Sequence, residues 1–288
     1  MICFLYPGQP LAFGAPLIND PDGRAIARLC RERTGFDPQQ LAWLAEPAGT
    51  EQTALQIYGT ALSLCHARQL RQAGTRPALV GEHSMGIYPA LAESGSLPEG
   101  EALELTARVG NALARMGLRR TYALGCIVGL TLEPLLAIAE EHEVYLANGN
   151  TSRHFLLSGR RPAIEEAVNE ALQCGAFSAR TFPCDAPLHT PLIEEVGQEL
   201  REIFADYRFQ EPHLPLFDHI DQECLTAAEL PGFLLRELCS PVQWERTYRA
   251  LRTAGATVFH EVGMAGGLLK YNRWIDSESR PPLESSRR

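Results

Sequence analysis

The chain has 288 residues, of which 45% are hydrophobic, and its formal net charge is −9. This length can bury one large hydrophobic core, or one core with a small satellite subdomain. The negative charge argues against a nucleic-acid surface, and no apolar run approaches the length of a membrane span. The eight cysteines lack C-x-x-C and Cys/His ligand spacing, which argues against a metal site and favours the reducing cytoplasm.

The first eighty residues contain two predicted strands and two predicted helices. Ile2–Tyr6 is a continuous apolar run ended by Pro7-Gly8, which predicts a buried strand and a turn. Helical patterns cover residues 24–33 and 52–74, and the short apolar run Pro77–Val80 predicts the second strand. This mixture indicates an α/β fold.

A serine follows the second strand and precedes a helical pattern at residues 87–92. Ser84 lies in the segment Glu82-His83-Ser84-Met85-Gly86, which differs from the usual G-x-S-x-G nucleophile elbow by having Glu82 in the first glycine position. An elbow places the hydroxyl beside free backbone amides that can stabilise an oxyanion. A serine at such a junction is also a common helix N-cap, so the motif alone leaves both interpretations open.

Residues 122–182 have a pattern of their own. A further helix begins at Pro98 and contains Arg108 among apolar residues, and the pattern then changes near Tyr122. The order β-α-β-β-α-β in about 60 residues predicts a ferredoxin-like subdomain inserted into the chain. Its expected elements are strands at 123–130, 143–147, 155–158 and 177–182, and helices at 133–141 and 162–174.

The chain then returns to the larger unit. His189 lies between Pro187 and Pro191 and precedes a helical run at 192–207. A helix at 230–238 and a strand at 258–263 follow. We therefore expect a large subdomain of residues 1–121 and 183–275, the insertion at 122–182, and a flexible tail at 276–288.

Several short motifs, in this order along the chain, resemble those of malonyl-CoA:acyl carrier protein transacylases and the acyltransferase domains of fatty acid and polyketide synthases. The resemblance covers most of the chain and includes Arg108, which falls where the family keeps an arginine. The matching segments are Tyr6-Pro7-Gly8-Gln9, Gln52-Thr53-Ala54-Leu55, His83-Ser84-Met85-Gly86, 150–159, Ala186-Pro187-Leu188-His189, Ser240-Pro241-Val242-Gln243-Trp244 and Glu261-Val262-Gly263.

The resemblance implies an α/β-hydrolase-like large subdomain interrupted by a ferredoxin-like one, with the active site between them. It implies transfer of a malonyl-type group from coenzyme A to the phosphopantetheine thiol of an acyl carrier protein, with no bound cofactor. Ser84 would be the nucleophile and His189 its general base, while Arg108 would pair with the acyl carboxylate. The remaining implied positions are the oxyanion-hole amides of Gln9 and Met85, the substrate-binding Gln52 and Asn150, and Glu237, which would orient His189.

Some positions depart from the family pattern. Glu82, Ile87, Pro10 and His154 each replace a residue common in the family, and Glu237 could act through its backbone carbonyl or its carboxylate. A serine thioesterase or hydrolase, and a non-catalytic acyl- or carrier-binding protein, therefore stay open as alternatives.

The other histidines and an arginine group also need interpretation. His83 is adjacent to Ser84, but neighbouring side chains diverge at such a turn, so we expect it to have a structural role. The sequence around four other histidines suggests no function, so we expect them on the surface: His66, His142, His213 and His219. A group of arginines could form a basic docking surface for an acidic carrier protein: Arg115, Arg119, Arg120, Arg160 and Arg161.

Overall fold

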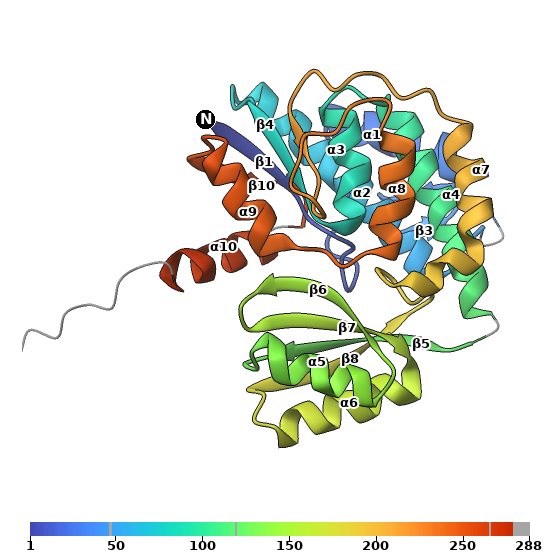
Figure 1. Ribbon diagram of the computed structural model, residues 1–288. Helices are drawn as coiled ribbons and strands as arrows, with labels where there is room; N and C mark the ends of the chain where they lie inside the picture. The colour runs from blue at the N-terminus through green and yellow to red at the C-terminus, as the bar shows by residue number, and fades with distance from the viewer. Residues whose placement is uncertain (46–47, 119, 265, 279–288) are drawn as a thin grey trace, which may run out of the picture.

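A four-stranded parallel sheet forms the centre of the larger part of the molecule. The computed structural model describes residues 1–45, 48–118, 120–264 and 266–278 (Figure 1). The strand order is β10-β1-β4-β9, and every neighbouring pair is parallel. The strands are β1 (Ile2–Tyr6), β4 (Leu79–Glu82), β9 (Leu216–Phe217) and β10 (Val258–Glu261). Strands covered on both faces tend to be continuously apolar, which is why β1 was predictable from its sequence.

Helices cover both faces of this sheet. Successive residues of a strand point to opposite faces, so Phe4 and Tyr6 of β1 belong to one hydrophobic cluster, while Cys3 and Leu5 belong to another. The first cluster includes residues of α3, α4, α7 and α8, and the second includes residues of α9 and α10. The helices are α1 (Pro21–Thr34), α2 (Glu51–Gln72), α3 (Ile87–Glu93), α4 (Glu99–Gly117), α7 (Gly197–Ala205), α8 (Leu230–Cys239), α9 (Trp244–Thr253) and α10 (Gly267–Glu278). Short elements complete this part: β2 (Phe36–Asp37), β3 (Ala42–Trp43), η1 (Ser84–Gly86) and η2 (Pro191–Val196).

The insertion has the predicted β-α-β-β-α-β order. Its elements are β5 (Tyr122–Val128), α5 (Leu132–Glu141), β6 (Tyr145–Thr151), β7 (His154–Arg160), α6 (Arg161–Gln173) and β8 (Ser178–Cys184). They form an antiparallel sheet of order β6-β7-β5-β8 with a hydrophobic core of its own. Figure 1 shows α5 and α6 on the outer side of this sheet, whose other face is turned toward the large subdomain. The fold is thus an α/β-hydrolase-like unit with a ferredoxin-like insertion.

The C-terminal third differs from the sequence-based expectation in several places. The single helix predicted for 192–207 is divided into η2 and α7, with Pro191 at the start of η2. Helix α9 was not predicted, although Trp244, Thr247, Tyr248 and Leu251 are buried at the spacing of one helical face. The expected tail at 276–288 is wrong for its first three residues, because they end α10; residues 279–288 lie outside the described part of the chain.

Backbone hydrogen bonds join the inserted sheet to the large subdomain. Gly149 N–H donates to the Val242 carbonyl over 2.8 Å, and Val242 N–H donates to the Ala147 carbonyl over 2.9 Å. These bonds attach β6 to the segment just before α9, and so hold the open sheet face opposite the carboxyl end of β4. None of the described helices is long and apolar enough to cross a membrane.

Candidate active site

The chain makes a sharp turn immediately after β4, and this turn presents Ser84. Ser84 has φ 56°, in the left-handed region that a nucleophile elbow imposes on its serine. The turn packs tightly against β1, since a Cβ added at Gly86 would lie 2.1 Å from the Tyr6 carbonyl oxygen. Only glycine fits there, and η1 then leads directly into α3. The local geometry is that of an elbow despite Glu82 in the first glycine position.

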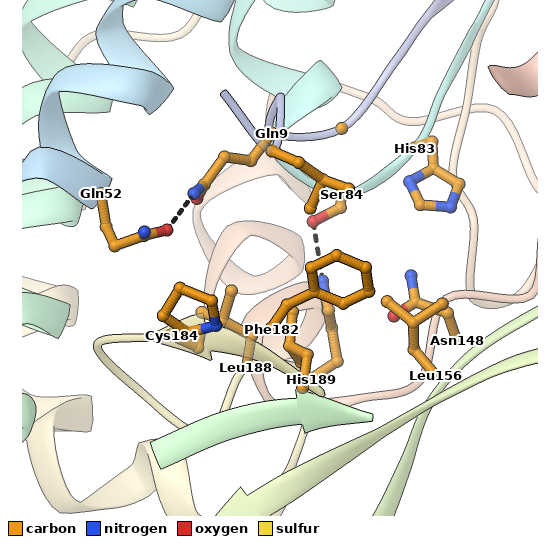
Figure 2. A pocket seen from close by; sticks show the side chains of 14 residues that line it. Gln9, Gln52, His83, Ser84, Asn148, Leu156, Phe182, Cys184, Leu188 and His189 are labelled. Carbon is orange, nitrogen blue, oxygen red and sulfur yellow. Dashed lines mark hydrogen bonds between the residues drawn. The ribbon is translucent and has the colours of Figure 1, made fainter. Parts of the chain in front are cut away.

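Ser84 and His189 form a hydrogen-bonded dyad, shown in Figure 2. The distance between Ser84 Oγ and His189 Nε2 is 2.7 Å. His189 Nδ1 lies 2.8 Å from the backbone carbonyl oxygen of Glu237. A carbonyl can only accept, so Nδ1 carries the proton and Nε2 is left to accept from the Ser84 hydroxyl. Burial lowers the pKa of His189 to about 3, which keeps the imidazole neutral at physiological pH. The dyad is therefore in the state that a general base requires.

The Glu237 side chain is not the group that orients His189. Its carboxyl group is fully buried, its oxygens have no hydrogen-bond partner among the described residues, and Oε2 is 3.8 Å from His189 Nδ1. Burial, with a further contribution from Glu82, raises the pKa of the Glu237 carboxyl well above its usual range. Glu237 thus holds the histidine through its backbone carbonyl and presents a neutral carboxyl group beside it.

A second buried pair lies next to the dyad. His219, expected on the surface, is instead fully buried, so that expectation was wrong. Its backbone N–H donates to Glu82 Oε1 over 3.1 Å, and its Nδ1 lies 2.7 Å from the same oxygen. Glu82 therefore connects the end of β4 to the loop after β9 through these hydrogen bonds. The contact joins residues 137 positions apart, which no local pattern could indicate.

His189, His219 and Glu237 each have a side-chain atom that could coordinate a metal ion, and these three atoms lie within 4.8 Å of one another. The Nδ1 atom of His189 is bonded to the Glu237 carbonyl, and the Nδ1 atom of His219 is bonded to Glu82. Both rings are thus already oriented by protein partners. The group is explained as the support of the Ser84–His189 dyad, and we assign it no metal.

A pocket opens in front of Ser84, between the two sheets. It is about 130 Å³ in volume. The large subdomain and the segment after β8 contribute Gly8, Gln9, Leu11, Gln52, His83, Ser84, Leu188 and His189, and the inserted sheet contributes Leu124, Asn148, Leu156, Phe182, Pro183 and Cys184.

Three glutamines form a hydrogen-bonded relay along one side of this pocket. Gln56 Nε2 donates to Gln9 Oε1 over 3.0 Å. Gln9 Nε2 in turn donates to Gln52 Oε1 over 2.5 Å, as Figure 2 shows. Because the Gln52 oxygen accepts from Gln9, the Gln52 Nε2 amide is left as a donor. Gln52 lines the pocket, which is compatible with its predicted substrate-binding role.

The two predicted oxyanion-hole residues lie next to the nucleophile. Met85 follows Ser84 in η1. The Gly8–Gln9 turn runs past the elbow, where a Cβ added at Gly8 would lie 3.6 Å from the Ser84 Cβ. This placement is compatible with the backbone amides of Gln9 and Met85 acting together on an oxyanion, which stays a prediction.

Arg108 does not reach the pocket. Its side chain pairs with Asp206 over 2.6 Å, lies over the Tyr207 ring, and lines a separate surface hollow with Glu101 and Glu104. Residues two apart on a helix are rotated by about 200°, and Gly110 is the α4 residue that faces Gln56. Arg108 thus points away from the site, and the role expected for it as the carboxylate partner is corrected.

Asn150 is the other predicted substrate-binding residue that lies outside the pocket lining. It is 2% exposed; His83 Nε2 lies 2.9 Å from its Oδ1, and its Nδ2 lies 3.1 Å from His154 Nδ1. Asn148 lines the pocket instead. The pairing of β6 with β7 shifts register between Gly149 and Thr151, so the usual alternation of strand side chains is interrupted there. His83 has the structural role expected for it, because it links the elbow to the inserted sheet.

The arginines proposed as a docking surface are largely paired. Arg115 contacts Glu199, Arg120 lies 3.3 Å from Glu195, and Arg161 lies 3.8 Å from Glu165. Arg119 lies outside the described residues. These pairs neutralise much of the positive charge, so the arginines do not by themselves support a carrier-docking surface.

Comparison with known proteins adds evidence on ancestry. The family model described as "Acyl transferase domain" matches residues 25–270. The malonyl CoA-acyl carrier protein transacylase of Salmonella typhimurium is 27% identical over 274 residues, covering 90% of this chain and 88% of that protein.

Solved structures show the same fold. The malonyl CoA-acyl carrier protein transacylase of Coxiella burnetii superposes with a TM-score of 0.87 at 24% identity, covering 96% of this chain and 91% of that one. A similar chain also occurs in a solved complex between a type II polyketide synthase acyl carrier protein and its malonyl-transacylase. It has a TM-score of 0.87 and 22% identity, and covers 96% of this chain and 93% of that one.

Proposed function

The chain belongs to the acyl transferase domain family, and from this premise we propose that it is an acyltransferase of the malonyl-CoA:acyl carrier protein type. It takes an acyl group from a coenzyme A thioester and passes it to the phosphopantetheine thiol of an acyl carrier protein. The observation that carries this proposal is the 2.7 Å contact between Ser84 Oγ and a neutral, oriented His189. The names of its relatives support a coenzyme A thioester as the donor and an acyl carrier protein as the acceptor.

The first half-reaction is an acyl transfer to Ser84. His189 Nε2 takes the hydroxyl proton as Oγ bonds to the thioester carbon, and the carbon–sulfur bond then breaks. The leaving coenzyme A sulfur receives the proton from His189. In the second half-reaction the phosphopantetheine thiol gives its proton to His189 and attacks the acyl-serine, which regenerates the Ser84 hydroxyl.

The protein's electrostatic contribution is directed at the two charges that form during each step. The backbone amides of Gln9 and Met85 are proposed to hold the oxyanion, a contribution that typically amounts to 10²- to 10³-fold in rate for each donor. The Glu237 carbonyl accepts from His189 Nδ1 and so stabilises the imidazolium as well as its orientation. No metal or bound cofactor is needed for these steps.

The proposal predicts a covalent intermediate. Incubation with a panel of acyl-CoA thioesters should add one acyl group to the intact protein, and peptide mapping should place it on Ser84. Ser84→Ala should abolish the mass increase, because the hydroxyl is the attacking group. Cys184→Ala is the matched control: its thiol also lines the pocket, and its removal should leave the adduct in place.

The same measurement separates the proposal from its alternatives. An adduct that remains on Ser84→Ala would contradict the mechanism, and a wild-type protein that binds acyl-CoA without any adduct would be a non-catalytic binder. A hydrolase would lose its acyl group to water at the same rate with or without carrier protein. A transferase should release it faster when phosphopantetheinylated carrier is added.

Two further proposals concern organisation and location. We propose the division expected from the sequence, with residues 122–182 as the inserted subdomain, because 122–184 carries its own sheet and core. We propose the cytoplasm as the compartment, since the buried thiols of Cys3, Cys30 and Cys65 suit a reducing environment.

A further inference from the structure

The pocket in front of Ser84 contains no arginine or lysine among the described residues that line it. Its fourteen lining residues are mostly apolar, and the polar ones are the amides Gln9, Gln52 and Asn148 together with Ser84 and two histidines. A buried carboxylate normally needs a cation or several strong donors, because desolvation of an unpaired charge is unfavourable. The composition of this pocket is therefore informative about the acyl group it holds.

The titratable groups in the pocket do not replace the missing cation. These groups are His83, His189 and Cys184. Burial lowers the pKa of His83 to about 4 and of His189 to about 3, so both imidazoles are neutral at pH 7. Burial raises the pKa of the Cys184 thiol to about 11, so it is also uncharged. The walls of the pocket thus carry no net charge of either sign at neutral pH.

The side of the pocket nearest α4 is filled by the glutamine relay. Gly110 of α4 faces Gln56, where an added Cβ would lie 2.9 Å from Gln56 Oε1, so α4 presents no side chain here. Gln56 holds Gln9, and Gln9 holds Gln52. The relay ends in the Gln52 amide, which is a neutral donor with a direction fixed by two hydrogen bonds behind it.

We propose that this pocket selects an acyl group that is uncharged at its free end, and that the Gln52 amide supplies its polar contact. The inference rests on the proposed acyltransferase function and narrows its substrate class. A neutral group loses little on entering such a pocket, whereas a free carboxylate exchanges its hydration for neutral amide donors without a cation. The penalty for a polar group without its full set of partners corresponds to at least about a tenfold loss in kcat/KM.

The first test compares acetyl-CoA with malonyl-CoA on the wild-type protein, by the rate of Ser84 acylation followed by intact mass. Acetyl-CoA should have the higher kcat/KM by at least about tenfold. Equal rates, or a preference for malonyl-CoA, would overturn the inference while leaving the proposed function in place. If no thioester acylates Ser84, the proposed function itself fails.

Two variants locate the cause of the preference. Gln52→Arg puts a cation at the end of the relay and should shift the acetyl-to-malonyl ratio toward malonyl by at least about tenfold. Arg108→Ala is the comparison, because that side chain is directed to Asp206 on the surface, and it should leave the ratio unchanged. A selective loss of malonyl transfer in Arg108→Ala would show that Arg108 does serve the pocket, and the inference would be wrong.

Discussion

Two buried glutamates support the dyad in different ways. Glu237 contributes its backbone carbonyl to His189, while Glu82 pairs with His219 in the loop after β9. Burial raises the pKa of both carboxyl groups well above their usual range and lowers that of His219 to about 4. Burial therefore disfavours charge on Glu82, Glu237 and His219. A single proton in the hydrogen bond between Glu82 and His219 leaves that pair without a net charge. The nucleophile is thus backed by neutral groups.

Glu237→Gln distinguishes the carbonyl from the carboxyl group as the orienting partner. A neutral carboxyl group resembles an amide in shape, and the substitution leaves the backbone carbonyl in place. We therefore expect kcat/KM for acyl transfer to change by less than about tenfold. If the carboxylate were the third member of a triad, the loss would be about 10⁴-fold, and a steady-state assay separates the two outcomes.

The β4–η1–α3 unit is the element on which the site depends. The turn can pass close to β1 because Gly86 has no side chain to clash with the backbone of Tyr6 and Pro7. His83 N–H donates to the Tyr6 carbonyl over 3.0 Å, which fixes the start of the turn. The position of the Ser84 hydroxyl therefore follows from backbone contacts rather than from side-chain packing.

Gly86→Ala should disrupt this unit. The added Cβ would lie 2.1 Å from a backbone oxygen, so the turn must shift, at a cost of about 1–3 kcal/mol in unfolding free energy. Acyl transfer should fall with it, because the Ser84–His189 contact is lost. Gly232→Ala in α8 is the control: its Cβ meets nothing within 4 Å, and the helix should gain up to about 1 kcal/mol. Equal denaturation midpoints for the two variants would contradict this account.

The elbow was predictable because its signal is local: Ser84 lies between a strand and a helix. His189 was predicted through the resemblance of its segment to the family motif, because the 105 positions that separate it from Ser84 leave no local signal of their contact. The orientation of Arg108 was not predictable, since a one-residue change in the placement of a helical face rotates a side chain by about 100°. The Glu82–His219 pair depends on a contact between distant segments, and the exchange of Asn150 for Asn148 depends on an irregular strand.

At the scale of the whole molecule, a histidine relay connects the two subdomains. It runs from His83 beside the nucleophile through Asn150 to His154 on β7, where Tyr271 of α10 also lies 3.4 Å from the ring. Burial lowers the pKa of His83 and of His154 to about 4. Burial disfavours a proton on either ring. A second proton on His83 would lie on Nδ1, which has no hydrogen-bond partner among the described residues, and a proton on His154 Nδ1 would remove the acceptor of the bond from Asn150.

Stability should therefore decrease with acidification. The unfolded chain binds protons at these histidines near pH 6.5, whereas the folded chain does so near pH 4, so the free energy of unfolding falls as pH drops through that window. Each histidine contributes up to about 3 kcal/mol. The raised pKa values of the Glu82 and Glu237 carboxyl groups act in the opposite direction above pH 4.5, but the four histidines with pKa values lowered to about 3 or 4, which include His189 and His219, outnumber them.

Thermal denaturation between pH 7 and pH 4.5 measures this slope. His154→Gln should keep the hydrogen bond from Asn150 and flatten the acid side of the curve, because it removes one of the proton-binding groups. A wild-type Tm that is constant or rises on acidification would contradict the assignment of neutral rings.

Ser84 and His189 both have left-handed backbones, with φ 56° and 59°. For residues other than glycine such a conformation typically costs on the order of 1–3 kcal/mol, which the rest of the fold must offset. Activity and robustness are consequently in conflict at these two positions. A selection for heat resistance alone would favour glycine there and would eliminate the catalyst. Engineering this protein for higher thermal stability as a biocatalyst should therefore leave Ser84 and His189 unchanged and introduce stabilising substitutions at other positions.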